Sequence, residues 1–180
     1  MYALSYAVNG LGLDRTAMLW VGVLANVAAL GAIPAWALLA DRIGRKPVFI
    51  GGSLGCAVLI FAFLGSIAAG DYVLIFVSGI GMFGLVYTAT SSVWPAFYGE
   101  MFPAKVRLSG TAIGTQIGFA VAGFGPAIAG ALAGDKGANW MAAAAFTAAV
   151  CLLNVVAIAT ARETHRVPTE QLGTRRPVPA

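Results

Sequence analysis

The sequence predicts an all-α membrane protein, with five full transmembrane helices and a partial helix at its N-terminus. Of its 180 residues, 59% are hydrophobic and only 10% are charged, and the mean hydropathy is +0.85. A soluble domain of this length needs a larger charged surface, so we expect the charges to lie outside a lipid phase. The apolar runs are continuous rather than alternating, which favours helices over the strands of a membrane barrel.

The five predicted helices are stretches without Asp, Glu, Lys, Arg or His, and together they form a predicted bundle over residues 16–161. Each is longer than the roughly 20 residues that a helix needs to cross about 30 Å of hydrocarbon. The stretches are Thr16–Ala40, Pro47–Gly70, Tyr72–Gly99, Leu108–Gly134 and Gly137–Ala161.

The segment Met1–Leu13 is apolar but too short to cross a bilayer by itself. It ends in turn-forming residues, Asn9–Asp14. We interpret residues 1–15 as the remnant of a transmembrane helix followed by an outer loop. A short helix in the membrane interface is the alternative.

The distribution of basic residues predicts the orientation in the membrane, because cytoplasmic loops carry the excess of Lys and Arg. The side of the bundle that holds the charged loop Asp41–Lys46 has nine basic residues, and the opposite side has two. We therefore expect this loop to be cytoplasmic. Residues 162–180, rich in Pro, Thr and Arg, are expected to form a disordered cytoplasmic tail. The nine residues are Arg42, Arg45, Lys46, Lys105, Arg107, Arg162, Arg166, Arg175 and Arg176, and the two are Arg15 and Lys136.

Several classes of function find no support in the sequence. The basic residues cluster in gaps between apolar runs, so nucleic-acid binding is not expected. Cys56 and Cys151 are far apart, and no Cys or His spacing predicts a metal site. A phosphate-binding loop, paired carboxylates and a Ser/His/Asp set are absent. We expect no enzyme activity and no cofactor.

One predicted helix carries small residues at every fourth position. Gly110, Gly114 and Gly118 form this row. Such a row lets another helix approach closely in a membrane. We predict that it is a helix-packing face.

The charged loop carries the first informative motif, Leu39-Ala40-Asp41-Arg42-Ile43-Gly44-Arg45-Lys46. The motif resembles the cytoplasmic-loop signature of the major facilitator superfamily, although Ala37 stands where that signature has glycine. The resemblance implies a gating role for five residues of the loop. These are Asp41, Arg42, Gly44, Arg45 and Lys46.

A second motif lies between the third and fourth full helices, in Tyr98–Gly110. It resembles the E-x-F-P-x-x-x-R-x-x-G segment of the metabolite:proton symporter branch, which includes carriers of shikimate, α-ketoglutarate, and proline or betaine. The resemblance adds Glu100, Pro103 and Arg107 to the predicted gate. Glu100 and Arg107 can pair with each other or with charges of the loop Asp41–Lys46, which we call the Asp41 loop.

The resemblance implies the C-terminal half of a twelve-helix carrier in the inner membrane of a bacterium, with a six-helix N-terminal half as the missing partner. Such carriers bind a small organic acid or zwitterion, together with a proton, between two halves and work by alternating access. Polar residues within the spans are the candidates for the substrate cavity. They are Tyr6, Asn9, Asn26, Tyr87, Thr88, Ser91 and Gln116.

No Asp, Glu or His lies within a predicted span, so a proton site is expected in the other half. The alternative function is that of a small, non-transporting membrane protein. It would act as a structural or regulatory partner through the glycine row.

Overall fold

The computed structural model describes residues 2–134 and 139–161, and every regular element in these ranges is helical. Within the described residues, five helices are long and apolar enough to cross a membrane, as the sequence predicts. The elements are α1 (Tyr2–Ser5), the π-helix η1 (Tyr6–Gly10), α2 (Arg15–Ile43), α3 (Arg45–Ala69), α4 (Tyr72–Gly79), the π-helix η2 (Ile80–Val86), α5 (Tyr87–Gly99), α6 (Arg107–Ala122), α7 (Gly125–Ala133) and α8 (Trp140–Thr160).

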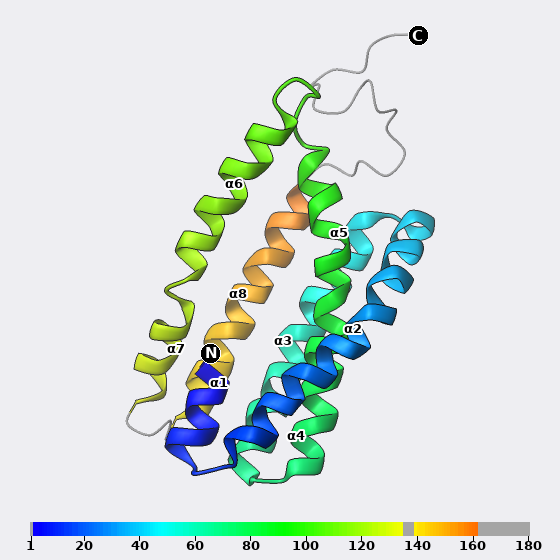
Figure 1. Cartoon of the computed structure of the whole chain (residues 1–180). Helices are drawn as coiled ribbons and strands as arrows, with labels where there is room; N and C mark the ends of the chain where they lie inside the picture. The colour runs from blue at the N-terminus through cyan, green and yellow to red at the C-terminus, as the bar shows by residue number, and fades with distance from the viewer. Residues whose placement is uncertain (1, 135–138, 162–180) are drawn as a thin grey trace.

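The long helices run up and down between two ends of a bundle (Figure 1). The α2–α3 turn, the α5–α6 loop and the end of α8 lie at one end, which we call the loop-motif end. The starts of α2 and α4 and the end of α7 lie at the opposite end. The two charged motifs therefore lie together, as the predicted topology requires.

Helix α3 is the centre of the bundle and packs against α8, α5, α4 and α2. In the most apolar stretch of α3, 50% of the residues are buried. In the corresponding stretch of the α6–α7 span, only 11% of the residues are buried. One apolar cluster, around Phe49, Val93 and Phe97, lies at the loop-motif end. A larger cluster, around Phe63, Ile67 and Ile75, lies at the opposite end.

Aspartates start two of the helices at the end opposite the loop motifs. The carboxylate of Asp14 accepts hydrogen bonds from the backbone N–H groups of Thr16 and Ala17, at 3.2 and 2.9 Å. Asp71 does the same for the first turn of α4. These contacts satisfy N–H groups that have no partner within a helix, and they explain why α2 and α4 begin directly after an aspartate.

Several predicted spans differ in detail from the observed helices. Helices α2 and α3 extend into the predicted loop Asp41–Lys46, of which only Gly44 lies outside a helix. The stretch Leu108–Gly134 is divided at residues 123–124 into α6 and α7. Pro126, near the start of α7, has no N–H to continue the α6 ladder. The last helix begins at Trp140, where the Asn139 side chain accepts a hydrogen bond from the N–H of Ala142 at 3.3 Å. The predicted tail, residues 162–180, lies outside the described residues.

Candidate functional site

A groove of about 470 Å³ lies between α2 and the η2–α5 segment, and the N-terminal helix α1 adds two residues to it. Four of the seven predicted cavity residues line it: Asn26, Tyr87, Thr88 and Ser91. We call this the α2–α5 groove. Its full lining is Ala3, Leu4, Met18, Leu19, Val21, Gly22, Ala25, Asn26, Ala29, Ile33, Phe63, Phe83, Tyr87, Thr88 and Ser91.

The polar side chains of the groove differ in whether their hydrogen-bonding groups already have partners within the protein. The Thr88 hydroxyl donates back to carbonyls of its own helix, those of Gly84 at 3.0 Å and Leu85 at 2.6 Å. Asn26 donates from Nδ2 to the Gly22 carbonyl at 2.8 Å, which leaves its amide oxygen available. The hydroxyls of Tyr87 and Ser91 have no partner among the described residues. Tyr87, Ser91 and the Asn26 oxygen are therefore the groups that can bind a ligand.

The π-helix η2 places these side chains, because Tyr87 follows directly after it. A π-helix shifts the register of backbone hydrogen bonds, and such segments often occur at functional sites. The indole Nε1 of Trp36 on α2 donates to the Leu85 carbonyl in η2 at 2.8 Å. This bond ties the π-helix to α2 across the groove. Among the described helices, π-segments occur in the N-terminal segment and in the α4–α5 span, which together carry five of the seven predicted cavity residues.

The remaining cavity candidates lie elsewhere. Tyr6 is buried against the ring of Tyr2, with the ring centroids 6.0 Å apart. Asn9 lies near the end of η1 and donates to the Ser5 hydroxyl at 3.2 Å. Gln116 is exposed on α6 and lies outside the α2–α5 groove.

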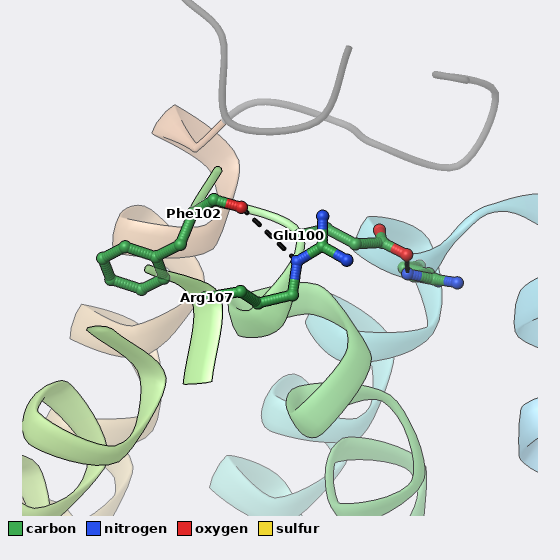
Figure 2. Close-up of polar contacts among 4 residues, drawn as sticks. Glu100, Phe102 and Arg107 are labelled. Carbon is green, nitrogen blue, oxygen red and sulfur yellow. Dashed lines mark hydrogen bonds and ion pairs between the residues drawn. The ribbon is translucent and has the colours of Figure 1, made fainter. Parts of the chain in front are cut away.

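The second loop motif meets the first one through an ion pair between Arg45 and Glu100 (Figure 2). The two side chains are 20% and 18% exposed. The Arg107 Nε donates to the Phe102 carbonyl at 3.4 Å, which closes the loop on itself. Of the two pairings predicted for Glu100, the structure shows the one with the Asp41 loop.

The Asp41 loop also holds the end of α8. The ammonium group of Lys46 donates to the carbonyls of Ala159 and Ala161, at 2.9 and 2.6 Å. These carbonyls belong to the last turn of the helix or follow it, where a cation is favourable. Gly44 separates α2 from α3 with a φ of 104°, a conformation that favours glycine.

Asp41, Arg42 and Pro103 are exposed. The Pro103 carbonyl accepts a hydrogen bond from the N–H of Val106 at 3.0 Å, one residue before α6 begins.

The glycine row of α6 has two kinds of surroundings. A Cβ at Gly110 would lie 2.5 Å from the Phe102 ring, so only glycine fits beneath this ring. Cβ atoms at Gly114 and Gly118 would meet nothing within 4 Å. In the described ranges no helix packs on this part of the row, and its helix-packing role stays a prediction.

Two polar contacts were not anticipated. The first is the Trp36 bond to Leu85, for which an indole within a span is a signal, since a buried Trp N–H normally has a partner. The second joins Asn154 on α8 to the Ser53 hydroxyl on α3 at 2.9 Å. In residues 2–134 and 139–161, no group of three His, Cys, Asp or Glu side chains is placed to hold a metal ion.

Comparison with known proteins confirms the family that the sequence resembles. The sequence profile described as Major Facilitator Superfamily matches residues 1–180. The shikimate transporter of Escherichia coli (strain K12) is 31% identical over 166 residues, which cover 92% of this chain and 38% of that protein. The citrate-proton symporter of Klebsiella pneumoniae is 29% identical over 173 residues, covering 90% of the chain and 39% of the symporter.

A third relative, the proline/betaine transporter of E. coli (strain K12), is 27% identical over 167 residues, covering 93% of the chain and 33% of the transporter. The chain thus spans less than two fifths of the length of these relatives. No solved structure matches it significantly. The relatives are transporters rather than enzymes, and with a profile match over its whole length the chain belongs to the major facilitator superfamily.

Proposed function

We propose that this chain forms the C-terminal half of a secondary transporter that carries a small organic acid or zwitterion together with a proton. The observation that supports this most is the α2–α5 groove, where Tyr87, Ser91 and Asn26 offer unused hydrogen-bonding groups within the spans. Tyr87 and Asn26 are exposed in this chain, and polar groups within a membrane span are costly where they lack partners. A polar substrate in the groove supplies them.

The groove is uncharged, which limits what it can recognise. Among the described residues, none that line it carries a charge. It therefore contacts hydroxyl or other neutral polar groups of the substrate. Among the described spans, Asp41 is the one Asp, Glu or His side chain; it is exposed in the last turn of α2 at the loop-motif end, and the middle of each span holds none that can relay a proton. In this proposal the proton site lies in a six-helix N-terminal half.

The contacts at the loop-motif end fit a gate that closes against a second half. Glu100 is paired on one oxygen, whereas its Oε2 is buried without a hydrogen-bond partner among the described residues. The Nη2 nitrogen of Arg107 is also buried without a hydrogen-bond partner among the described residues. Buried polar atoms normally find partners. Both groups are therefore available to a loop of the other half when the carrier is closed on this side.

Uptake into proteoliposomes tests the proposal. With an imposed proton gradient, the chain alone should give no uptake of labelled shikimate, because half of the transport path is missing. A fusion of the first six helices of the E. coli shikimate transporter to this chain should restore uptake. Robust proton-driven uptake by the chain alone would contradict the proposal, and an inactive fusion that folds normally would do so as well.

The same fusion tests the groove with two neighbouring serines. Ser91 lines the groove, whereas the hydroxyl of Ser92 donates to the Ala89 carbonyl at 3.0 Å and lies outside it. We expect Ser91→Ala to raise KM about three- to tenfold, the effect of one lost hydrogen bond of roughly 1 kcal/mol. Ser92→Ala should leave KM unchanged. Equal effects of the two substitutions would remove the groove from the transport path.

A further inference from the structure

A second cavity, of about 570 Å³, lies between the N-terminal helices and α7, at the end of the bundle opposite the loop motifs. We propose that it binds the carboxylate group of a small organic acid. It has polar and apolar walls, and one guanidinium group borders it. We call it the Arg15 cavity, and its lining is Tyr2, Leu4, Ser5, Val8, Asn9, Arg15, Pro126, Ala127 and Gly130.

The charge of the cavity comes from Arg15, which has no ion-pair partner among the described residues. Asp14 and Asp71 lie at the same end of the bundle, but their carboxylates bind the N–H groups that start α2 and α4. No acidic side chain lines the cavity in the described part of the chain. The guanidinium therefore keeps its positive charge and its planar set of donors for a ligand, and such a set matches a carboxylate.

The second observation is an unused hydroxyl group. The Tyr2 hydroxyl is buried and has no hydrogen-bond partner among the described residues. Its ring is stacked on that of Tyr6, with an angle of 4° between the ring planes, so the hydroxyl is held in one place. A buried polar atom without a partner is rare in folded proteins. Tyr2 and Arg15 line the same cavity, and Arg15 is exposed there without an ion-pair partner among the described residues, so one ligand can meet both groups.

The remaining polar groups also favour an anion. Asn9 donates one amide hydrogen to the Ser5 oxygen at 3.2 Å, which leaves the Ser5 hydrogen and a second Asn9 hydrogen to be donated. The cavity thus offers donors in excess of acceptors. Its apolar wall, formed by residues such as Val8 and Pro126, suits the hydrocarbon part of an organic acid. The volume lies within the range of small-molecule sites, about 300–1,000 Å³.

The position of the cavity connects it with the α2–α5 groove, because Leu4 lines both. The inference rests on the proposed function in one respect, namely that the bound acid is the transported substrate. In that case the Arg15 cavity recognises the charge of the acid, and the uncharged groove recognises its hydroxyl groups. Binding of a carboxylate at Arg15 is independent of transport and can be measured without it.

A cysteine at Gly130 reports on the cavity. A Cβ at this position meets nothing within 4 Å, so the side chain fits. The chain carries Gly130→Cys in a Cys56→Ala, Cys151→Ala background and is placed in lipid nanodiscs. The rate of thiol modification by a negatively charged methanethiosulfonate is then compared with the rate for a positively charged one. Modification is measured with and without shikimate, its uncharged methyl ester, inorganic phosphate or chloride, at equal ionic strength. A compound that binds in the cavity should slow modification of the thiol.

We expect shikimate to slow modification in a saturable manner, whereas its methyl ester and chloride should not. Arg15→Gln should weaken this protection about tenfold or more, as expected for a charge-assisted hydrogen bond. The control is Lys105→Gln, which removes an exposed cation in the α5–α6 loop at the other end of the bundle. Tyr2→Phe should weaken protection about fivefold, the effect of one neutral hydrogen bond.

Three results would overturn the inference. One is protection that is the same in Arg15→Gln as in the parent. Another is equal protection by shikimate and its methyl ester, which would remove the role of the carboxylate. The third is equal protection by phosphate, which would assign the cavity to oxyanions in general. None of these results depends on uptake, so they are distinguishable from a failure of the proposed function.

Discussion

Gly84 sets the distance between α2 and the π-helix η2. A Cβ at this position would lie 2.9 Å from the Ala25 carbonyl oxygen and 3.0 Å from the Ala28 side chain. Those distances are shorter than side-chain contacts normally are, and one of the atoms is backbone. The close approach also brings Trp36 within hydrogen-bonding distance of Leu85. Gly84 therefore fixes the shape of the groove without touching its ligand-binding groups.

Substitution of Gly84 provides a test at the residue scale. Gly84→Ala should lower the free energy of unfolding by about 1–3 kcal/mol, the cost of an extra methyl group in a packed interior. Gly81 is the matched control, since it lies in the same π-helix and a Cβ there meets nothing within 4 Å. Gly81→Ala should leave stability unchanged or raise it slightly. Thermal unfolding in detergent measures both, and equal melting temperatures would contradict the close approach.

At the scale of elements, the Asp41 loop joins three helices at one end of the bundle. Arg45 begins α3 and pairs with Glu100 after α5, while Lys46 holds the end of α8. An ion pair that is largely removed from water costs desolvation energy, so its strength depends on both partners being present. The loop thus fixes the relative positions of α3, α5 and α8.

A double-mutant cycle measures the coupling between α3 and α5. Glu100→Gln or Arg45→Gln alone should reduce the free energy of unfolding by up to about 3 kcal/mol, because a mostly buried charge is left unpaired. The double variant should lose less than the sum, with a coupling energy of about 0.5–3 kcal/mol. Denaturant titration in detergent gives these values. Additive losses would show that the pair contributes nothing.

The last turn of α8 depends on Lys46. In Lys46→Met the carbonyls of Ala159 and Ala161 lose a charged donor, and we expect about 1 kcal/mol less protection of this turn. Hydrogen exchange of the backbone amides over residues 157–161 measures the effect. Lys105→Met is the control, because Lys105 is exposed in the loop before α6. Similar exchange in both variants would contradict this role.

The whole molecule leaves much apolar surface uncovered on particular helices. No side chain of α6 is buried, and Ile113, Ile117 and Phe119 are each about 60% exposed or more. By contrast, α3 is enclosed by its neighbours. A surface of this kind must be covered by lipid or by another set of helices. In the proposed carrier, part of it faces the N-terminal half.

The orientation in the membrane is a prediction for the whole molecule. By the excess of basic residues, the loop-motif end should be cytoplasmic. Lys105→Cys and Asp71→Cys place thiols at opposite ends of the bundle, in a background without Cys56 and Cys151. In intact bacterial cells, a membrane-impermeant maleimide should label position 71 and spare position 105. The reverse pattern would contradict the predicted orientation.

The number of spans was predictable, since it depends on the length of the apolar runs, although the division of the fourth span into α6 and α7 was not. The meeting of the two loop motifs was also predictable from topology, but the partner of Glu100 was not. From the sequence, both Arg107 and the basic residues of the Asp41 loop were possible partners of Glu100. The fold turns Arg107 toward the Phe102 carbonyl and leaves Arg45 as the partner.

The sequence by itself determined the class of protein, its spans and its family, because lipid imposes composition and length directly on each helix. Only the tertiary structure decided which polar side chains are free to act. Thr88 and Ser91 look alike in sequence, yet Thr88 donates to its own helix while Ser91 faces the groove. Likewise, only packing places Arg15 and the Tyr2 hydroxyl in the lining of one cavity, where neither has a partner among the described residues. Hydrogen-bond availability depends on neighbours that are distant in sequence, and these are set by how the helices pack.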